Sequence, residues 1–386
     1  MLGGSKLTLF RKRLLTWFEQ SRRDLPWRRT KDPYRIWLSE IMLQQTRVAA
    51  AIPYYQRFLE HFPDVRALAD APEEEVLRLW AGLGYYSRAR NLQKAARQIV
   101  AEHGSHFPKN REEALALAGI GEYTAAAILS IAYRKQFAVL DGNVARVLAR
   151  LIALRGDLRA EGRWRQLQGL ASKLLAPQAP GDWNEAMMEL GATICTPRSP
   201  QCLLCPLADF CQARQLGLTD SIPQKRRKQA TVEVQLAALV LVDANYNTLL
   251  LSPSHHLPKS GKDSDVAALL SRMWHFPTIA VSHDPERDLR MYVRAKRFRG
   301  LRSRAKFLPL SPVHHTVTHR DILVFPFRTE LRELPYAPGA KHLPLHDLSS
   351  VPISSLTRKV AAAAALNQKQ QRSGLPDGTA MLRFQT

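Results

Sequence analysis

Residues 115–130 read LALAGIGEYTAAAILS, and residues 137–148 read FAVLDGNVARVL. Gly119 and Gly121 predict a tight turn that opens a helix, since glycine adopts backbone conformations that other residues avoid. Backbone groups in such a turn approach a phosphate closely, directly or through a bound monovalent cation, and the start of the following helix favours negative charge. A plain helix–helix turn has the same pattern, so both interpretations stand at this point.

The turn lies within a long helical region. Apolar residues recur at helical spacing in several segments, and short loops with Gly or Pro separate these segments. They are residues 77–104, which end at a glycine, and residues 124–133, 143–154 and 164–176. We therefore expect a mainly α domain over residues 1–220.

The composition changes towards the second half of the chain. Residues 225–228 read KRRK, within a predicted basic linker at 221–232. Alternating apolar residues at 231–242, and β-rich segments that follow, predict strands, so we expect an α+β domain over residues 233–365. Residues 366–386 are predicted to form a flexible tail.

The charge balance favours a polyanionic partner. The chain has 386 residues, with 56 Lys and Arg against 34 Asp and Glu, a formal net charge of +22. Such an excess favours nucleic acid, because binding releases counterions from the phosphates. Residues 290–306 carry basic side chains and no acidic one. The sequence has neither a run of about 18 apolar residues nor a secretory signal, so we expect a cytoplasmic protein without a membrane segment.

All four cysteines lie in one short segment. Cys195, Cys202, Cys205 and Cys211 follow the pattern C-x6-C-x2-C-x5-C. Four thiolates this close can hold an iron–sulfur cluster or a zinc ion. Zinc ribbons usually carry two C-x2-C pairs, so the single pair here favours iron, and a yellow-brown colour would distinguish the two. Arg198, between the first two cysteines, is a candidate phosphate contact.

Two carboxylates have the surroundings of catalytic groups. Glu40 is bordered by apolar residues such as Trp37 and Ile41. It is therefore either paired with a cation or has a raised pKa and can act as an acid. Asp141 follows an apolar run and precedes a helix that is predicted to start near Asn143, where capping that helix is its simplest role.

Together these features resemble a known family. Residues 7–211 are similar to the helix-hairpin-helix DNA glycosylases of the endonuclease III superfamily, through the glycine turn, the segment LDGNVARVLAR at 140–150 and the cysteine spacing. The resemblance implies a 4Fe–4S cluster and a catalytic aspartate at Asp141. One departure is Ala118, where this turn commonly has proline. Relatives that also cut the DNA backbone have a lysine where this chain has Tyr123, so we expect base removal alone.

Three further segments resemble the adenine-specific branch of the superfamily, the MutY type. They are residues 25–48, 82–92 and 183–195. In that branch a Nudix-related module follows and reads 8-oxoguanine, and residues 273–281 and 315–320 occupy the corresponding places. A catalytic Nudix protein needs an R-E-x-x-E-E element for magnesium, which this part of the chain lacks, so we expect recognition without hydrolysis.

The recognition loop of the second domain departs from the family pattern. Val317, Thr318 and His319 stand where the family often has Phe-Ser-His. A hydroxyl and an imidazole remain for hydrogen bonding, while the aromatic ring is lost.

The resemblance also implies roles for the catalytic candidates. Glu40 would protonate adenine at N7 as the glycosidic bond breaks. Asp141, ionised, would stabilise the oxocarbenium-like sugar or bond to it transiently before water attacks. Asn143 would position groups around Asp141 or the water, and Tyr123 would hold the flipped adenine.

Other residues are expected to contact the base or the DNA. Glu185 and Arg28 would line the base pocket, with Arg28 reaching toward the target strand. Gln45 and Thr46 resemble the family's probe of the opposite strand, and Tyr85 its wedge between bases, although Tyr85 could also simply pack on its own helix. The expected DNA contacts are Gln45, Thr46, Tyr85, Gly119, Gly121, Arg198, Thr318 and His319.

The expected partner is double-stranded DNA with adenine opposite 8-oxoguanine or guanine, bound by a monomer at the nucleoid of a bacterial-type cell. A thymine glycosylase for T·G mismatches can share Tyr123, but the second domain and Glu40 argue against it, since thymine has no N7 to protonate. A non-enzymatic lesion-binding protein of the same fold would have lost Glu40 or Asp141, and both are present.

Overall fold

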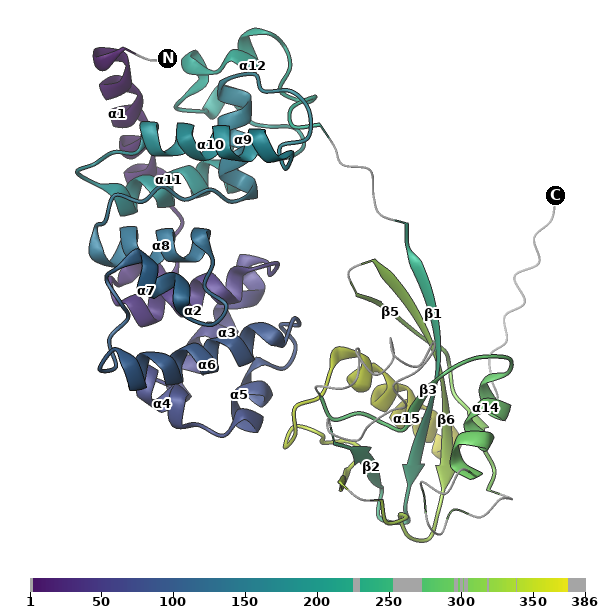
Figure 1. The fold of residues 1–386 in the computed structure, drawn as a ribbon. Helices are drawn as coiled ribbons and strands as arrows, with labels where there is room; N and C mark the ends of the chain where they lie inside the picture. The colour runs from purple at the N-terminus through teal and green to yellow at the C-terminus, as the bar shows by residue number, and fades with distance from the viewer. Residues whose placement is uncertain are drawn as a thin grey trace, which may run out of the picture. The chain divides into compact units, whose positions relative to one another are not determined.

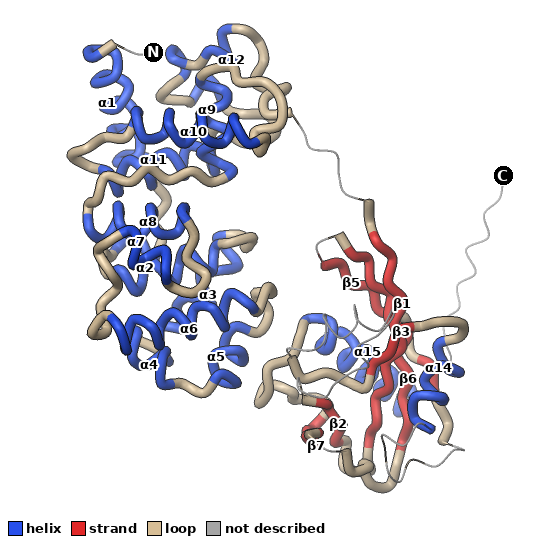
Figure 2. Tube along the Cα trace, in the orientation of Figure 1, coloured by secondary structure: helices blue, strands red, loops and turns tan. Residues whose placement is uncertain are grey.

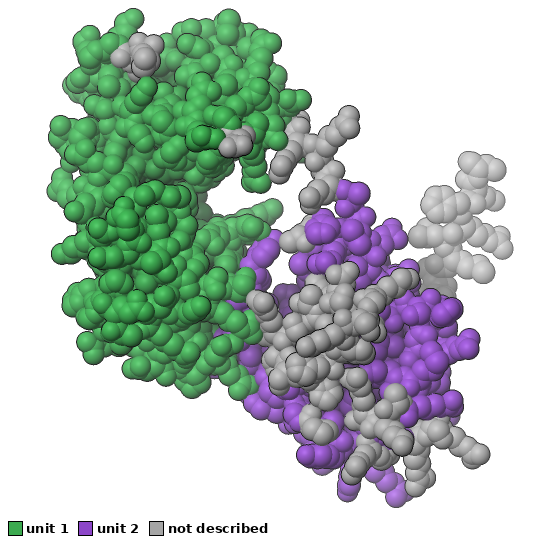
Figure 3. Space-filling model, in the orientation of Figure 1, with its two compact units in different colours: residues 1–76, 87–228 green, residues 77–86, 229–386 purple. Residues whose placement is uncertain are grey.

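The computed structural model describes residues 3–224, 230–252, 273–294, 298, 301, 305–317, 319–337 and 339–373. The chain forms two compact units, one of residues 1–76 and 87–228 and the other of residues 77–86 and 229–386 (Figure 3). The boundary after residue 228 falls inside the stretch predicted as a linker. The short segment 77–86, by contrast, groups with the second unit and not with the helical domain in which sequence analysis placed it. Within the described ranges, no helix is both long and apolar enough to span a bilayer.

The first unit consists of helices joined by short loops (Figure 1). Aspartate and asparagine side chains cap several of them: Asp32 accepts a hydrogen bond from the first turn of α2, and Asn110 does the same for α7. The elements are α1 (Gly4–Ser21), η1 (Pro26–Arg29), α2 (Pro33–Leu43), α3 (Val48–His61), α4 (Val65–Asp70), α5 (Glu73–Trp80), α6 (Ser87–Glu102), α7 (Arg111–Ala116), α8 (Glu122–Tyr133), α9 (Gly142–Leu151), α10 (Glu161–Leu174), α11 (Pro180–Thr193), η2 (Cys202–Leu204), η3 (Ala208–Phe210) and α12 (Gln212–Gln215).

The core of this unit positions the later site. Helix α2 packs on α8, and α11 packs on α8, α9 and α1. Large aromatic side chains such as Trp37 and Trp183 are almost fully buried between these helices. Burial on this scale fixes the backbone of α2, α8, α9 and α11, so the polar side chains they carry have defined positions.

The helical pattern predicted over residues 77–104 is interrupted in the structure, which corrects that expectation. Helix α5 ends at Trp80 and α6 begins only at Ser87. Between them Gly82 and Gly84 have φ angles of 113° and 70°, which lie outside the helical region. Apolar spacing alone did not reveal the break, because the residues on both sides of it are apolar at helical intervals.

The predicted glycine turn joins α7 to α8, as expected. Gly119 has a φ of 77°, and a Cβ atom added there would lie 2.8 Å from the Cβ of Asn91. Both the backbone conformation and the available space therefore require glycine. Gly121 is the N-cap residue of α8. Because glycine has no side chain, no side-chain hydrogen bond from this residue caps the backbone N–H groups of the first turn.

The second unit is an α+β structure around one seven-stranded sheet (Figure 2). Its order is β4-β6-β1-β2-β7, with β3 paired to β1 and β5 to β6. Strands β1 and β6 run parallel and pair along their whole length, while the other pairs are antiparallel. The strands are β1 (Val232–Val242), β2 (Asn247–Leu251), β3 (Thr278–Ala280), β4 (Leu308–Pro309), β5 (Val313–Val317), β6 (Arg320–Glu330) and β7 (Ala340–Pro344).

Both faces of the sheet are covered. Leu236 and Val240 of β1 belong to a core that also contains residues of α15 (Ser355–Ser373). Leu239 and Leu241 point to the other face and join a second core with residues of α14 (Pro285–Tyr292). Side chains of this strand therefore alternate between two faces, but from Leu236 to Val242 both faces are buried and apolar, so the predicted alternation of apolar residues does not extend to this half of the strand.

The flexible tail was predicted from residue 366, but α15 extends to Ser373. The helix is anchored by Leu356, Val360 and Ala364, which recur every four residues and are buried in the sheet's core. Residues 366–373 read LNQKQQRS, and Leu, Gln, Lys and Arg have high helix propensity, so the anchored helix continues through them. Residues 374–386 of the predicted tail lie outside the described residues.

Candidate active site and cysteine loop

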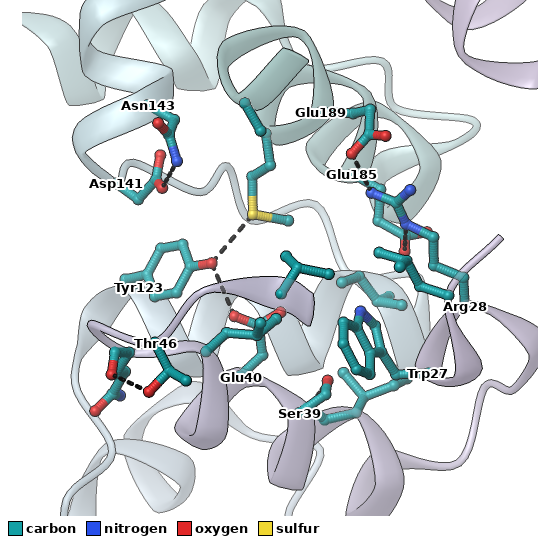
Figure 4. A pocket seen from close by; sticks show the side chains of 18 of the residues that line it. Trp27, Arg28, Ser39, Glu40, Thr46, Tyr123, Asp141, Asn143, Glu185 and Glu189 are labelled. Carbon is teal, nitrogen blue, oxygen red and sulfur yellow. Dashed lines mark hydrogen bonds and ion pairs between the residues drawn. The ribbon is translucent and has the colours of Figure 1, made fainter. Parts of the chain in front are cut away.

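A cavity of about 690 Å³ opens in the first unit between η1, α2, α8, α9 and α11 (Figure 4). Its wall brings together predicted residues that are far apart in the sequence. They are Arg28, Glu40, Gln45, Thr46, Tyr123, Asp141, Asn143 and Glu185. Figure 4 shows Tyr123 between Asp141 and Glu40, with Glu185 and Arg28 on another part of the wall.

Glu40 lies on α2 and is 7% exposed. Burial raises the pKa of its carboxyl group to about 7, while the hydrogen bond from Tyr123 opposes this effect and the negative charge of Asp141 adds to it. Of the two alternatives left open by the sequence, the structure supports the raised pKa. Glu40 makes no ion pair with any residue in the described ranges, and its Oε2 accepts the Tyr123 hydroxyl at 2.8 Å.

Tyr123 lies in the first turn of α8, directly after the glycine turn. Its hydroxyl is 2.8 Å from Glu40 Oε2 and 3.1 Å from the Met188 sulfur. Burial, together with the charges of Glu40 and Asp141, raises the pKa of this hydroxyl well above its usual value. The group is therefore neutral, and it donates a hydrogen bond to the Glu40 carboxylate.

Asp141 is the N-cap residue of α9, as the sequence suggested. Its Oδ1 accepts the backbone N–H of Val144 at 2.7 Å and its Oδ2 accepts the Asn143 side chain at 3.0 Å. Burial raises the pKa of Asp141, and these two hydrogen bonds counteract the increase. The positive end of the α9 dipole further favours the anion. The Asp141 side chain therefore both caps α9 and lines the cavity.

A chain of hydrogen bonds links Asp141 to the cysteine segment through Asn143 and Arg146. Asn143 also accepts a hydrogen bond from Arg146 at 2.9 Å, and Arg146 donates to the Cys195 carbonyl at 2.8 Å and to the Gly191 carbonyl at 2.8 Å. Sequence analysis did not single out Arg146. Its place three residues after Asn143 on a predicted helix was a usable signal, because side chains at this spacing lie on the same helix face.

A second set of charges lines the other part of the cavity wall. Arg28 lies 2.9 Å from Glu189 and 3.5 Å from Glu185, and Arg23 lies 2.6 Å from Glu189. Burial favours the neutral form of Glu189, but hydrogen bonds from Arg23 and Arg28 outweigh it and lower the pKa to about 2. Burial raises the pKa of Glu185, against the nearby charges of Lys31 and Arg28. Sequence analysis missed Glu189 and Arg23.

The loop after α2 carries Gln45 and Thr46. Gln45 has a φ of 57°, a left-handed conformation that is rare for residues other than glycine. The buried guanidinium of Arg88 donates to the carbonyls of Gln44 and Met42 at 2.6 and 3.0 Å, which ties the loop to the end of the helix. The structure therefore holds Gln45 in a defined, strained conformation.

The remaining predicted DNA contacts do not line this cavity. Tyr85 is 41% exposed, with a φ of 47°, and belongs to the segment that groups with the second unit. Arg198 is exposed in the cysteine segment, and its carbonyl accepts the Thr196 hydroxyl at 2.9 Å. His319 is exposed between β5 and β6, and Thr318 lies outside the described residues.

The four cysteines line one small cavity beside the end of α9. Within the described ranges, no group of three His, Cys, Asp or Glu side chains is arranged to hold a single metal ion. Arg150, also in the wall of this cavity, places a guanidinium nitrogen 3.2 Å from Cys195 Sγ. A wall of four thiols and a buried guanidinium could hold a multi-atom anionic cluster.

The sequence of the first unit matches known families. Residues 38–199 match the HhH-GPD superfamily of base excision DNA repair proteins. Residues 195–211 match the iron–sulfur binding domain of endonuclease III, and this range begins and ends at predicted ligands. The match therefore confirms the predicted iron–sulfur cluster, and the matched segment contains Cys195, Cys202, Cys205 and Cys211.

Curated relatives of the chain are adenine DNA glycosylases. The mouse protein is 34% identical over 92% of this chain and 77% of its own length. The human protein is 49% identical, over 55% of this chain and 40% of its own length, so the chain spans less than half of that relative. The protein of Buchnera aphidicola from Acyrthosiphon pisum is 36% identical over 62% and 68%, respectively.

A solved structure extends the similarity to three dimensions. A thermostable thymine-DNA glycosylase superposes with a TM-score of 0.51 and 30% identity, over 55% of this chain and 98% of that protein. The fold predicted for the first unit is thereby confirmed.

Proposed function

Since this chain belongs to the adenine DNA glycosylase family, we propose that it is a monofunctional DNA glycosylase that removes adenine paired with 8-oxoguanine or guanine. The single observation that carries the proposal is that two carboxylates with different surroundings, the buried Glu40 and the half-buried Asp141, line one cavity. Glu40 has a pKa of about 7 among apolar residues, whereas Asp141 is held at a helix N-terminus. Two carboxylates with separated tasks are what hydrolysis of a glycosidic bond requires.

Glu40 is the acid in this proposal. Adenine is a poor leaving group as an anion, so a proton must reach it, at N7, as the bond to the sugar breaks. A carboxyl group with a pKa of about 7 still holds its proton in much of the protein near neutral pH and yet releases it readily. Tyr123, hydrogen-bonded to Glu40, then stabilises the carboxylate that forms.

Asp141 is the anion that stabilises the positive sugar. Its two oxygens are held by Val144 and Asn143, so the charge needs no rearrangement when the oxocarbenium-like ion forms. The ion either persists beside Asp141 or bonds to it transiently, and water then attacks. Asn143, itself fixed by Arg146, would position Asp141 or that water.

The wall of the cavity supports base release without strand cleavage. A glycosylase that also cuts the backbone needs an amine to form a Schiff base with the sugar. The residues that line the cavity, all within the described ranges, include arginines and Tyr123 but no lysine. The product would therefore be an intact strand with an abasic site.

DNA binding is proposed from charge and from the loops. The net charge of +22 favours phosphates, and the turn at Gly119 and Gly121 would approach one directly or through a monovalent cation. The flipped adenine would lie between Tyr123 and the wall formed by Glu185 and Arg28. Extrusion of a base costs a few kcal/mol, least at a mismatch. The strained Gln45 and Thr46 would fill the gap, and Tyr85 would act as a wedge between bases.

The second unit would read the opposite base. We propose that it is a Nudix-related module and that Thr318 and His319 contribute hydrogen bonds to 8-oxoguanine. Arg198 would contact a phosphate near the cysteine segment. The protein would act as a monomer on the nucleoid in the cytoplasm of a bacterial-type cell.

A thymine glycosylase for T·G mismatches is the second candidate, because a thermostable thymine-DNA glycosylase has a similar fold. The buried Glu40 speaks against it, since thymine offers no N7 to protonate. A lesion-binding protein without activity is disfavoured by the intact carboxylate pair.

A single-turnover assay on three duplexes tests these functions. The duplexes pair A with 8-oxoguanine, A with G, and T with G, and strand breaks are scored before and after alkali. We expect adenine release from the first two and breaks only after alkali. Glu40→Gln and Asp141→Asn should abolish release while DNA binding survives, and the exposed control Glu60→Gln should match the wild type. Release of thymine alone, or rapid excision by either variant, would refute the proposal.

A further inference from the structure

We propose that Arg150 is a positioning residue for the iron–sulfur cluster, to which it donates hydrogen bonds at the Cys195 ligand and at a further sulfur of the cluster. The proposal rests on the cysteine cavity and on the iron–sulfur match of residues 195–211. It is independent of the substrate proposed above.

Three contacts fix the Arg150 side chain, which lies in the last turn of α9 and is 1% exposed. Its Nε donates to the Ile222 carbonyl at 2.8 Å, and its Nη1 donates to the Thr196 carbonyl at 2.8 Å. The same Nη1 lies 3.2 Å from Cys195 Sγ. A planar guanidinium held at two nitrogens has a fixed orientation.

The third guanidinium nitrogen of Arg150, Nη2, differs from the other two. Arg150 Nη2 is buried and has no hydrogen-bond partner among the residues that the structure describes. Leaving a buried charged donor unpaired is costly. Arg150 lines the same cavity as Cys195, Cys202, Cys205 and Cys211, and a cluster bound by these thiolates would offer sulfur acceptors there.

Such a contact has consequences for the cofactor. Hydrogen bonds and positive charge at the sulfurs stabilise the more electron-rich state of an iron–sulfur cluster, so they raise its reduction potential. Outer-shell partners of a ligand also strengthen metal binding, and their loss typically weakens it about 10- to 100-fold. Arg150 should therefore both raise the potential and slow the loss of the cluster.

The test uses the full-length protein with its cluster and compares Arg150→Met, Arg150→Lys and the control Arg13→Lys. Arg13 binds Asp209 of the cysteine segment at 2.6 Å and lies over the Phe210 ring, so it anchors the same segment through other residues. The midpoint potential is measured on an electrode without DNA, where one electron passes between electrode and cluster and no bond changes. Iron–sulfur stretching bands and the rate of cluster loss to an iron chelator are measured alongside.

We expect Arg150→Met to lower the midpoint potential by about 59 mV or more, which is a tenfold change in the redox equilibrium. Cluster loss should become about tenfold faster or more. Arg150→Lys keeps the charge but not the planar fork, so it should shift both quantities less, and Arg13→Lys should shift neither.

Wild-type potential and stretching bands in Arg150→Met would overturn the proposal, as would an equal shift in Arg13→Lys. If circular dichroism shows that Arg150→Met does not fold, Arg150→Lys decides. Wild-type values in that variant would refute the assignment, because one ammonium group cannot reproduce the contacts of two guanidinium nitrogens.

Discussion

Replacing Tyr123 with phenylalanine should move the alkaline limb of the excision rate to higher pH. Glu40 must hold its proton to act as the acid, so the wild-type rate should fall above about pH 7, which is the pKa of this buried carboxyl group. The Tyr123 hydroxyl donates to Glu40 Oε2 at 2.8 Å and lowers that pKa. Without this donor the carboxylate is less stable, and the proton is retained to higher pH.

The size of the shift follows from the strength of the hydrogen bond. A hydrogen bond to a charged group contributes about 1.5–3 kcal/mol, and one pKa unit corresponds to about 1.4 kcal/mol. The limb should therefore move by about one to two pH units, to about pH 8–9. A lower maximal rate is also expected, because Tyr123 would hold the base, but the maximal rate does not determine the position of the limb.

The assay is single-turnover excision from a duplex with A opposite 8-oxoguanine, followed across pH. Tyr133→Phe is a matched control, because Tyr133 lies at the other end of α8 and donates to the Phe107 carbonyl at 2.7 Å, outside the cavity. Its limb should coincide with that of the wild type. A Tyr123→Phe limb that stays in place or moves to lower pH would show that Glu40 is not the group whose protonation governs the rate.

Three further predictions concern stability. The pKa of Glu40 is raised on folding, so its carboxylate destabilises the fold increasingly from about pH 4.5 to 7, by up to about 3 kcal/mol. Glu40→Gln should therefore raise the melting temperature at pH 8 and change it little at pH 4. Equal shifts of the melting temperature at both pH values would contradict this. Gly119→Ala should lower the free energy of unfolding, measured by chemical denaturation, by at least about 1–2 kcal/mol, because Gly119 has a φ of 77° and lies close to Asn91. Gly121→Ala should lower it clearly less, because the space around Gly121 is open. The pKa of Glu189 is lowered on folding, so its carboxylate stabilises the fold by about 3 kcal/mol above pH 4.5, and this stabilisation is lost as the pH falls toward 2. Glu189→Gln should therefore lower the melting temperature at pH 7. An unchanged melting temperature would refute the assigned ion pairs.

The catalytic pair could be predicted from the sequence because each residue carries a local signal. Asp141 ends an apolar run at the start of a helix, and Glu40 is surrounded by apolar neighbours on its own helix. These signals specify burial and capping, which are the two causes that later set the pKa values. The glycine turn was equally readable, since the positive φ of Gly119 is a local backbone property; its close approach to Asn91 is a tertiary contact that the sequence did not indicate.

The charge network of the opposite wall could not be predicted in the same way. Arg23 and Arg28 meet Glu189 across more than 160 residues of chain, so no local pattern indicates the pairing. The helix break between Trp80 and Ser87 and the longer α15 were also missed. At the break apolar periodicity was present, and backbone conformation decided where the helix ended. The end of α15 had no apolar pattern to reveal it, because residues 366–373 read LNQKQQRS and follow Ala364, the last α15 residue in the sheet's core.

Helix α9 carries Asp141 at one end and Arg150 at the other, within ten helical residues. Each residue advances an α-helix by about 1.5 Å and turns it by about 100°. A single inserted or deleted residue between them would leave Asp141 in its capping place while swinging the arginine about a quarter-turn or more around the axis. The number of residues in this segment is thus a constraint in its own right, separate from the identity of its side chains.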